Sequence, residues 1–471
     1  MKTVSLILLL LTYNLRATAQ NCDCETNLDS LIVNVERNYA GYYDKVNQHS
    51  LDHYSRLKDS LRKECTTLSG YDCYLLLKKY IHFFHDPHLT LNIVDLENAN
   101  LDSIRSLFKA FPKRPVDEIA LKQYFKEIDE STIEGIWQAN MVNYKVAVIK
   151  DTTCEFDFIG FVIDGDSLFW FPGQMKMGFK RQGAVYKVHY LRSDHFPDDR
   201  IMRLEKGEML ISGYGTWRRT FPVAKKVPEK KSQVRFNELP GNVSLFSIGN
   251  FSLSSKALID SLIEVNSDRI RNSRYFLIDL RNNSGGVSMA FDNLLPLVYT
   301  RPIVRDGFMV RSSKDNIKLY QQSAKDSVYS NEIREAFKSM VEKMQQQPDT
   351  LVLIHSTDTS RYENLLPGPS KVAVIVNEGT VSAAETFVLL ARQSDKVTIF
   401  GTHTRGALDY TEIADPRPLP CSYLSYFCPM GTKQWKVFPR IDNVGIKPEI
   451  TIPDVEPDWV NYVIKYYSSR K

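Results

Sequence analysis

The stretch from residue 371 to residue 410 constrains the fold of this chain more than any other part of the sequence. Residues 372–376 form an unbroken apolar run, which is typical of a short strand buried on both faces of a sheet. Turn residues 377–379 follow this run, and residues 382–391 have the composition of a helix. Ser382 therefore stands at a sharp strand-to-helix junction, where its hydroxyl is exposed and neighbouring backbone N–H groups point outward. A serine nucleophile and its oxyanion hole need this geometry.

The same serine has a simpler structural interpretation. Ser382 and Glu385 have the S-x-x-E spacing of a capping box, in which the two side chains satisfy free N–H groups at the start of a helix. Taken by itself, this spacing indicates a helix cap more often than a nucleophile. The choice between the two depends on what the rest of the chain brings to the same place.

Strands and helices alternate from residue 234 onward, which predicts an α/β domain with largely parallel central strands. The expected strands are 243–248, 275–280, 372–376 and 397–400, and the expected helices are 256–265, 382–391 and one from about Met289, with a helical insertion near 318–347. Two loops, 281–286 and 377–382, leave the carboxyl ends of buried strands, where ligands collect in open α/β sheets. The Gly285-Gly286 pair would let backbone N–H groups approach a substrate closely, although a plain turn could contain the same pair.

Two further regions precede this domain. Residues 28–121 show helical spacing of apolar side chains, and residues 143–221 change to a period of two, which predicts a separate small β domain, either a barrel or a sandwich. The β strands are expected at 145–149, 156–163, 167–171, 184–191, 201–204, 208–211 and 216–221. A charged, proline-bearing linker follows. The predicted division is therefore a helical domain at 20–122, a β-rich domain at 123–221, a linker at 222–233 and the α/β domain at 234–471.

The N-terminus has the pattern of a signal peptide spanning residues 1–19. Lys2 supplies the positive charge, residues 4–11 the apolar segment and Ala17-Thr18-Ala19 the cleavage site, and the apolar run is too short to anchor the chain in a bilayer. The expected location is periplasmic or extracellular. With 43% hydrophobic residues, 25% charged residues and a net charge of +4, the composition is that of a soluble globular protein and makes no case for nucleic acid or an anionic membrane as partner.

Seven cysteines in an exported protein predict disulfides. Cys22 and Cys24 lie in the same helical region as Cys65 and Cys73. Cys421 and Cys428 could close a loop, which would leave Cys154 over, and the connectivity stays open.

Three histidines occur within seven residues, but their spacing does not favour a metal. Pro87 ends the helix at Asp86 and so places His88 off the helical face that His82 and Asp86 share. We therefore expect no metal and no cofactor. His88 becomes a functional candidate only if a nucleophile elsewhere needs a base.

Four motifs in fixed order resemble the tail-specific (carboxy-terminal-processing) protease family. They are IDLRNNSGG at 278–286, VAVIVNEGTVSAAE at 372–385, IFGTHTRGALDY at 399–410 and DNVGIKPEI at 442–450. Together they span about the last two fifths of the chain. The resemblance implies the family's peptide-hydrolysing activity and its α/β core.

The resemblance also implies roles for particular residues. Ser382 would be the acylating nucleophile, and the N–H of Ala383 with that of Gly285 or Gly286 would form the oxyanion hole. Three other residues on the motifs are candidates for binding substrate or bracing the site: Arg281, Thr404 and Gly406.

The source of the base separates two branches of the family. The better-known branch uses a Ser–Lys dyad, but Ala407 occupies the position of its lysine here. The other branch, which looks like the tricorn protease, takes a histidine from a D-x-H motif near the N-terminus, and Asp86-Pro87-His88 is similar to it. Asp442 occupies the position of the acid that orients this histidine. A Ser382–His88–Asp442 triad would therefore be assembled between domains.

The function expected from this resemblance is an exported serine peptidase that hydrolyses peptides or unfolded proteins. The β domain shows no PDZ-type carboxylate loop, so its contribution to recognition is open, as is the oligomeric state. Two alternatives remain: a non-catalytic peptide- or ligand-binding protein on the same scaffold, and an esterase-like acyl hydrolase that uses the same site.

Overall fold

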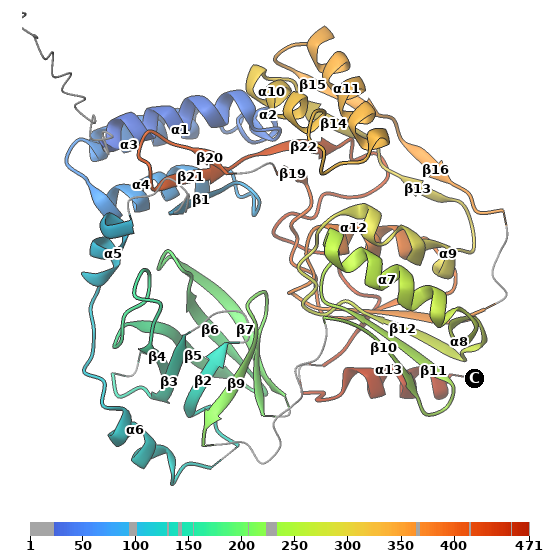
Figure 1. Ribbon diagram of the computed structural model, residues 1–471, viewed down its shortest axis with the longest axis horizontal. Coiled ribbons are helices and arrows are strands. Elements are labelled where there is room, and N and C mark those ends of the chain that lie inside the picture. The colour runs from blue at the N-terminus through green and yellow to red at the C-terminus, as the bar shows by residue number, and fades with distance from the viewer. Residues whose placement is uncertain are drawn as a thin grey trace, which may run out of the picture.

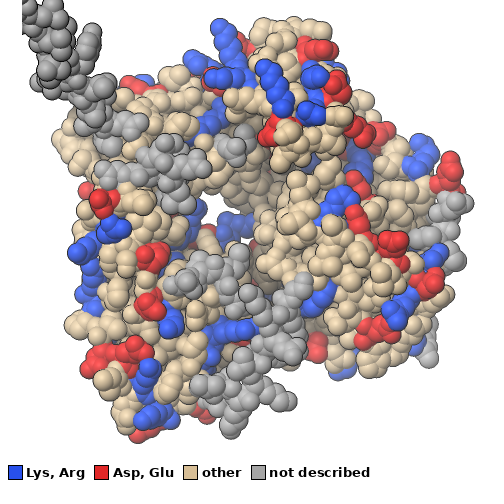
Figure 2. Space-filling model, in the orientation of Figure 1, with Lys and Arg blue, Asp and Glu red and all other residues tan. Residues whose placement is uncertain are grey.

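The chain folds into three regions that surround a central hollow (Figures 1 and 2). The computed structural model describes residues 23–93, 101–129, 131–139, 144–153, 155–205, 207–222, 233–363, 368–413, 416–453 and 455–470. The predicted signal peptide and nearly all of the predicted linker lie outside these residues. The fold class expected from the sequence is confirmed: helices come first, then a β barrel, then an α/β domain with a mostly parallel sheet.

The N-terminal region is built from four helices, a strand and a fifth helix. They are α1 (Cys24–Asn38), α2 (Tyr42–Lys45), α3 (Leu51–Cys65), α4 (Gly70–His82), β1 (Thr90–Ile93) and α5 (Leu101–Lys109). Helix α1 begins where the Asp23 carboxylate accepts the N–H of Thr26, and it buries Leu28, Leu31 and Val35 along one face. Because α4 ends before Pro87, His88 lies in the loop that leads into β1, as expected.

The cysteines settle part of the predicted disulfide pattern. Cys24 and Cys73 form a disulfide between α1 and α4, whereas Cys65 is a buried free thiol. The Cys421–Cys428 disulfide suggested by the sequence does not form. Cys428 is a buried free thiol, and Cys421 is disulfide-bonded to another cysteine. Cys22 and Cys154 lie outside the described residues.

A segment from the C-terminal part of the chain completes the core of the helical region. Strands β20 (Arg417–Pro418) and β21 (Leu424–Phe427) form a three-stranded sheet with β1, in which Thr90 is opposite Phe427. Leu419 and Tyr426 are buried among the N-terminal helices. The loop that carries His88 is thereby held against the C-terminal part of the chain.

The second region is a closed antiparallel barrel of eight strands. They are β2 (Gly135–Ala139), β3 (Lys145–Lys150), β4 (Phe158–Asp164), β5 (Met175–Gln182), β6 (Val185–Leu191), β7 (Pro197–Glu205), β8 (Glu208–Ile211) and β9 (Gly215–Phe221). Helix α6 (Glu118–Phe125) packs Phe125 against its outside. Of the two predicted architectures, the barrel is the one observed.

The strand predictions in this region failed at three places. Strands β2 and β5 were missed, and the strand expected at 167–171 is a turn. The Asp166 carboxylate accepts the N–H groups of Leu168, Phe169 and Trp170, so these groups are not available to a neighbouring strand.

The third region contains a six-stranded sheet in the order β10-β11-β12-β17-β18-β23, parallel except for the edge strand β10. The strands are β10 (Val234–Leu239), β11 (Val243–Ile248), β12 (Tyr275–Asp279), β17 (Val372–Val376), β18 (Val397–Gly401) and β23 (Ile450–Thr451). Helices α7 (Leu253–Val265), α9 (Leu295–Val298) and α12 (Ala383–Ala391) cover one face, and α13 (Trp459–Ser468) covers the other. The apolar run at 372–376 is buried on both sides for this reason.

The remaining elements extend this domain. The helix expected from Met289 is two short 3-10 turns, η1 (Ser288–Ala290) and η2 (Asp292–Leu294), followed by α9. The insertion contains α10 (Lys314–Ser323) and α11 (Asn331–Gln346), which pack on a second sheet ordered β15-β14-β22-β19. The other elements are α8 (Ser267–Asn272), β13 (Ile303–Arg305), β14 (Phe308–Arg311), β15 (Leu351–His355), β16 (Asp358–Ser360), β19 (Tyr410–Ile413) and β22 (Pro429–Lys433). Among the described residues, no helix is both long enough and apolar enough to cross a bilayer.

Candidate active site

Ser382 occupies a strained position between β17 and α12. Its backbone angles are φ 55° and ψ −113°, which a residue with a side chain rarely adopts. The turn before it is braced by Asn377, whose Oδ1 accepts the N–H of Asn282 at 2.8 Å and that of Gly379 at 3.0 Å. The Thr380 hydroxyl donates to the carbonyl of Leu280 at 2.9 Å. The two loops expected at the carboxyl ends of β12 and β17 are thus joined into one rigid unit.

Two backbone N–H groups beside Ser382 have no protein acceptor. Within the described residues, neither the N–H of Ala383 nor that of Gly286 donates a hydrogen bond. The N–H of Gly285 donates to Asn283 Oδ1 at 2.9 Å, so of the two glycines considered as oxyanion donors, Gly286 is the one whose N–H is free. A Cβ on Gly285 would lie 3.0 Å from Ser382 Cβ, which shows how closely the two loops approach.

Glu385 ties Ser382 to the third sequence motif. Its fully buried carboxylate accepts hydrogen bonds from the N–H of Ser382 (2.9 Å), the hydroxyl of Thr404 (2.6 Å), the N–H of Gly406 (2.7 Å) and the N–H of Ala407 (2.9 Å). Burial raises the pKa of this carboxyl, while these hydrogen bonds act to lower it. Thr404 and Gly406, which the sequence offered as substrate-binding or bracing candidates, are two of these donors.

His88 is held by a backbone carbonyl. Its Nδ1 lies 2.8 Å from the carbonyl oxygen of Tyr410, which can only accept, so Nδ1 is the protonated nitrogen and Nε2 is free to accept a proton. The backbone N–H of His88 donates to Asp86, whose other oxygen accepts the hydroxyl of Tyr39 at 2.7 Å. Burial lowers the pKa of His88, and the charges of Asp442 and Glu385 oppose this shift.

Asp442 is anchored on one oxygen only. Its Oδ1 accepts the N–H groups of Leu408 and Asp409, both at 2.7 Å, while Asp409 in return accepts the N–H groups of Ile441 and Asp442. Its Oδ2 is buried without a hydrogen-bond partner. Burial, reinforced by the charges of Asp86 and Asp409, raises the pKa of Asp442 to about 7.

The segment 404–410 brings the three predicted catalytic residues together. The N–H groups of Gly406 and Ala407 donate to Glu385, which caps Ser382. The N–H of Leu408 donates to Asp442, and the carbonyl of Tyr410 accepts from His88. Among the described residues, no hydrogen bond joins the Ser382 hydroxyl to the His88 ring, and Tyr410 rather than Asp442 contacts Nδ1. Glu385 caps the N–H of Ser382 as predicted, but Tyr410 was not identified from the sequence as the partner of His88.

Arg281 interacts with neighbouring side chains of the α/β domain. Its guanidinium forms an ion pair with Asp279 at 2.8 Å and lies over the ring of Trp459, at 5.4 Å from the ring centre. Arg203 of the barrel lies over the same ring at the same distance and forms an ion pair with Glu378 at 2.5 Å. The barrel therefore contacts the turn that carries Ser382.

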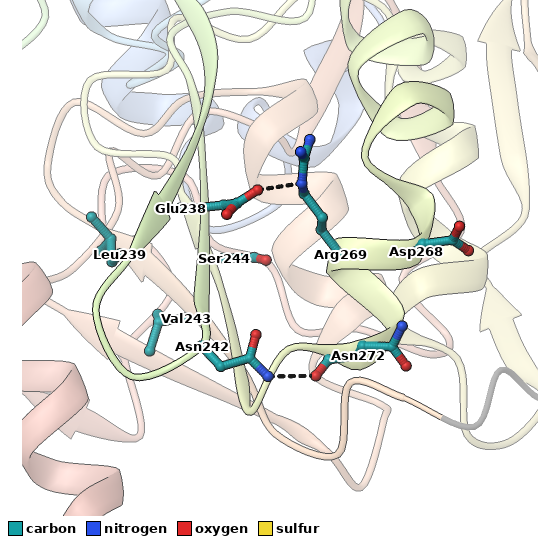
Figure 3. A pocket seen from close by; sticks show the side chains of 8 residues that line it. All are labelled: Glu238, Leu239, Asn242, Val243, Ser244, Asp268, Arg269 and Asn272. Atoms are coloured by element: carbon teal, nitrogen blue, oxygen red, sulfur yellow. Dashed lines mark hydrogen bonds and ion pairs between the residues drawn. The ribbon is translucent and has the colours of Figure 1, made fainter.

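The described residues contain no cluster of three or more potential metal ligands. A cavity of about 270 Å³ lies between the β10–β11 hairpin and α8. Figure 3 shows the Glu238–Arg269 ion pair and the hydrogen bond from Asn242 to Asn272 beside it. Asn242 and Val243 stand at the amino end of β11, so this cavity is at the opposite end of the sheet from Ser382.

Comparison with known proteins decides the family. Residues 242–451 match the model of peptidase family S41, and this span includes all four motifs and Ser382. The match assigns this part of the chain to peptidase family S41. The chain is 22% identical to a probable CtpA-like serine protease of Staphylococcus epidermidis over 391 residues, which are 78% of this chain and 68% of the relative. A probable CtpA-like serine protease of Staphylococcus haemolyticus is 23% identical over 354 residues, 70% of this chain and 61% of the relative.

Solved structures show similar chains at low identity. Mature CPAF complexed with lactacystin has a TM-score of 0.49 and 14% identity, covering 95% of this chain and 97% of that one. The photosystem II D1 C-terminal processing protease has a TM-score of 0.41 and 13% identity, with coverage of 92% and 95%. The tricorn protease has a TM-score of 0.38 and 12% identity, covering 95% of this chain and 37% of that one. The predicted family and the predicted serine-type peptidase class are confirmed by the family match and the CtpA-like relatives, whereas the tricorn-like branch stays a prediction.

Proposed function

We propose that this S41 peptidase is an exported enzyme that cleaves peptide bonds with Ser382 as nucleophile, His88 as general base and Asp442 as the acid that supports it. The observation that carries the proposal is the strained turn at Ser382, flanked by the two unpaired N–H groups of Gly286 and Ala383. Strain of this kind persists only where surrounding contacts over-determine it, and it concentrates at active sites.

The chemistry follows from the groups present. A serine hydroxyl has too high a pKa to attack unaided, so Nε2 of His88 takes its proton as Oγ adds to the scissile carbonyl. The oxyanion that forms accepts hydrogen bonds from Gly286 and Ala383. His88 then donates the proton to the leaving amine, and water hydrolyses the acyl-enzyme with the same base.

Asp442 acts through charge in this scheme. The Tyr410 carbonyl sets the tautomer of His88, and the ionised Asp442 stabilises the imidazolium that forms during attack. Catalytic hydrogen bonds often tighten when substrate binds, so the scheme does not require a Ser382–His88 bond in the free enzyme.

Export is the second part of the proposal. The Cys24–Cys73 disulfide supports an oxidising compartment, because structural disulfides are rare in reducing cytosol. Fractionation of cells that express the full chain tests this directly. Recovery of the whole protein, unprocessed, in the cytosol with reduced cysteines would overturn it.

Fluorophosphonate labelling tests the catalytic assignment. The mature protein is expected to label at one site, Ser382→Ala not at all, and His88→Ala and Asp442→Asn more slowly, with the histidine variant the slower of the two. Failure of the folded wild type to label excludes Ser382 as an activated nucleophile. Casein and simple esters then separate a peptidase from an acyl hydrolase that uses the same site.

A further inference from the structure

Tyr410 contacts His88 through its backbone, while its side chain is held by a separate set of contacts. The ring is fully buried and packs edge to face against the ring of Tyr39, with the two ring centres 5.3 Å apart. A Cβ added at Gly41 would lie 2.8 Å from a ring carbon of Tyr410, so the loop before α2 closes tightly on the ring. The packing therefore gives the ring one position, in which its hydroxyl reaches α2.

The hydroxyl of Tyr410 lies between the charged groups of Arg440 and Asp44. Nη1 of Arg440 donates to the hydroxyl at 2.7 Å, and the hydroxyl donates to Oδ2 of Asp44 at 3.0 Å. Nη2 of Arg440 donates to the same carboxylate oxygen at 2.7 Å. Asp44 belongs to the helical region, whereas Arg440 stands two residues before Asp442 in the α/β domain. In Figure 1 this contact lies where α2 approaches β19 and β22.

A second set of contacts leads from Tyr39 to the backbone of the same histidine. The hydroxyl of Tyr39 donates to Oδ2 of Asp86 at 2.7 Å, and Oδ1 of Asp86 accepts the N–H of His88 at 2.8 Å. Tyr410 holds the imidazole ring instead, through its carbonyl oxygen 2.8 Å from Nδ1. Since the two tyrosine rings pack against each other, a displacement of Tyr410 would disturb both contacts of His88.

We propose that Arg440 and Asp44 are positioning residues for the base. By holding the hydroxyl of Tyr410, they keep its carbonyl against Nδ1 of His88. The imidazole then stays in the tautomer and orientation in which Nε2 can accept the proton of Ser382. This role rests on the proposed function, in which His88 is the base. Because the two charged side chains are 45% and 40% exposed, their ion pair adds little to the stability of the fold, so its loss should affect catalysis more than folding.

Fluorophosphonate labelling of the mature protein measures the effect on catalysis. Arg440→Gln, Asp44→Asn and Tyr410→Phe should each lower the maximal labelling rate by about 5- to 20-fold, because a small misplacement of a base is costly. The probe concentration that gives half the maximal rate should change by less than about two-fold, since these groups do not contact the probe. The double variant Arg440→Gln/Asp44→Asn should be no slower than the slower single variant, because both substitutions break one network.

NMR of histidine rings labelled with nitrogen-15 reports the state of His88 without any turnover. At about pH 8 the imidazole is neutral, and in the wild type its Nδ1 should be protonated and its Nε2 bare. The signals are identified by their loss in His88→Ala. In Arg440→Gln and Tyr410→Phe the two nitrogen shifts should move towards each other, because the ring then samples both tautomers. A change confined to the stability of the fold would not move them.

The control is the Arg62–Asp29 ion pair, which joins α1 and α3 at 3.0 Å and is 46% and 49% exposed. Arg62→Gln and Asp29→Asn should leave the labelling rate and the histidine shifts as in the wild type.

The two measurements separate the possible failures. If Arg440→Gln and Tyr410→Phe label at the wild-type rate, or label slowly with unchanged His88 shifts, the positioning role is wrong. If the folded wild type does not label, the proposed function fails, and the shifts still show whether Arg440 holds the ring of His88.

Discussion

Ser382 carries a conformational cost that its neighbours offset. A non-glycine residue in such a sparsely populated region costs about 1–3 kcal/mol. The cost is sustained because Asn377 and Thr380 connect the turn to the preceding strand and to the adjacent loop. Other residues in the chain also have positive φ, so the angle alone does not identify the nucleophile. The proposal therefore rests on the angle together with the two unpaired N–H groups beside it.

The pH profile of peptide hydrolysis is the first prediction at the residue scale. His88 must be neutral to accept the proton of Ser382, and burial places its pKa below the ordinary 6.5. Asp442 takes up a proton near pH 7. As the pH falls, kcat/KM should therefore drop in two steps, first by a few-fold near pH 7 and then fully below 6.5.

Asp442→Asn should remove the first step. At pH 8 the variant is expected to be several-fold slower than the wild type, because the charge that stabilises the imidazolium is gone. At pH 6 the two enzymes should have similar kcat/KM, since Asp442 of the wild type is then mostly protonated and as neutral as the amide that replaces it. Parallel profiles for the two proteins across this range would contradict an electrostatic role for Asp442.

The stability of Asp442→Asn gives a second prediction. The folded pKa of Asp442 lies above its unfolded value, so the folded state binds the extra proton between about pH 4 and pH 7, and that stabilisation is lost as the pH rises through 7. The asparagine variant should therefore be more stable than the wild type at pH 8, by about 1–3 kcal/mol, and equally stable near pH 4. Thermal melts at the two pH values measure this. Asp268→Asn, in which the lost charge is 87% exposed, should show no such pH dependence.

Loops, rather than helices or strands, position the chemistry at the scale of structural elements. The loop after β12 supplies Gly286, the loop after β17 supplies Ser382, and the segment 404–410 connects both to His88 and Asp442. Each loop is attached to a buried strand, so its backbone is fixed at one end by the sheet. Hydrogen bonds between neighbouring loops fix the other end.

A glycine substitution tests how tightly these loops approach. In Gly285→Ala the new methyl would lie 2.8 Å from the carbonyl oxygen of Val381 and 3.0 Å from Ser382 Cβ, so the turn must move. Labelling of Ser382 should slow by about 100-fold. Gly241→Ala is the matched control, because its φ of 82° is close to the 80° of Gly285 but nothing lies within 4 Å of the new methyl. It should cost about 1–2 kcal/mol of stability and leave the labelling rate unchanged. Equal labelling rates in the two variants would show that crowding at Gly285 is unimportant.

At the scale of the whole molecule, the site depends on all three regions. The helical region contributes His88, the α/β domain contributes Ser382 and Asp442, and the barrel contacts the catalytic turn through Arg203 and Glu378. The C-terminal strand β21 pairs with β1, so the helical region is completed by residues more than three hundred positions away. The α/β domain without its neighbours would therefore lack the base.

A double-mutant cycle measures how much the barrel contributes to catalysis. Arg203→Gln and Glu378→Gln should each lower kcat/KM by about 10-fold, and the double variant should be no worse than either, because the ion pair is mostly buried. The matched control is Arg218–Glu208, an ion pair of similar exposure that lies within the barrel. The same two substitutions there should not change kcat/KM. Additive losses in the first cycle would mean that the barrel does not act through this contact.

Local patterns in the sequence were sufficient for the strand, the turn and the helix that surround Ser382 in the α/β domain. The apolar run at 372–376, the turn after it and the S-x-x-E spacing act over fewer than about fifteen residues, so a strand, a tight turn and a capped helix follow from neighbouring residues alone. The same reason made three other features predictable: the strand-to-helix turn at Ser382, the end of the helix before His88 and the alternating strand pattern at 143–221.

Tertiary structure decided which groups act together. His88 is held by Tyr410, which lies 322 positions away in the chain, and neither residue type nor spacing indicates that pairing. The choice of Gly286 over Gly285 as a free donor depends on Asn283, whose side-chain Oδ1 accepts the N–H of Gly285 while its Nδ2 donates to the carbonyl of Ile248. These arrangements depend on contacts between residues far apart in the chain, whereas the periodicity of a sequence reflects only contacts between neighbouring residues.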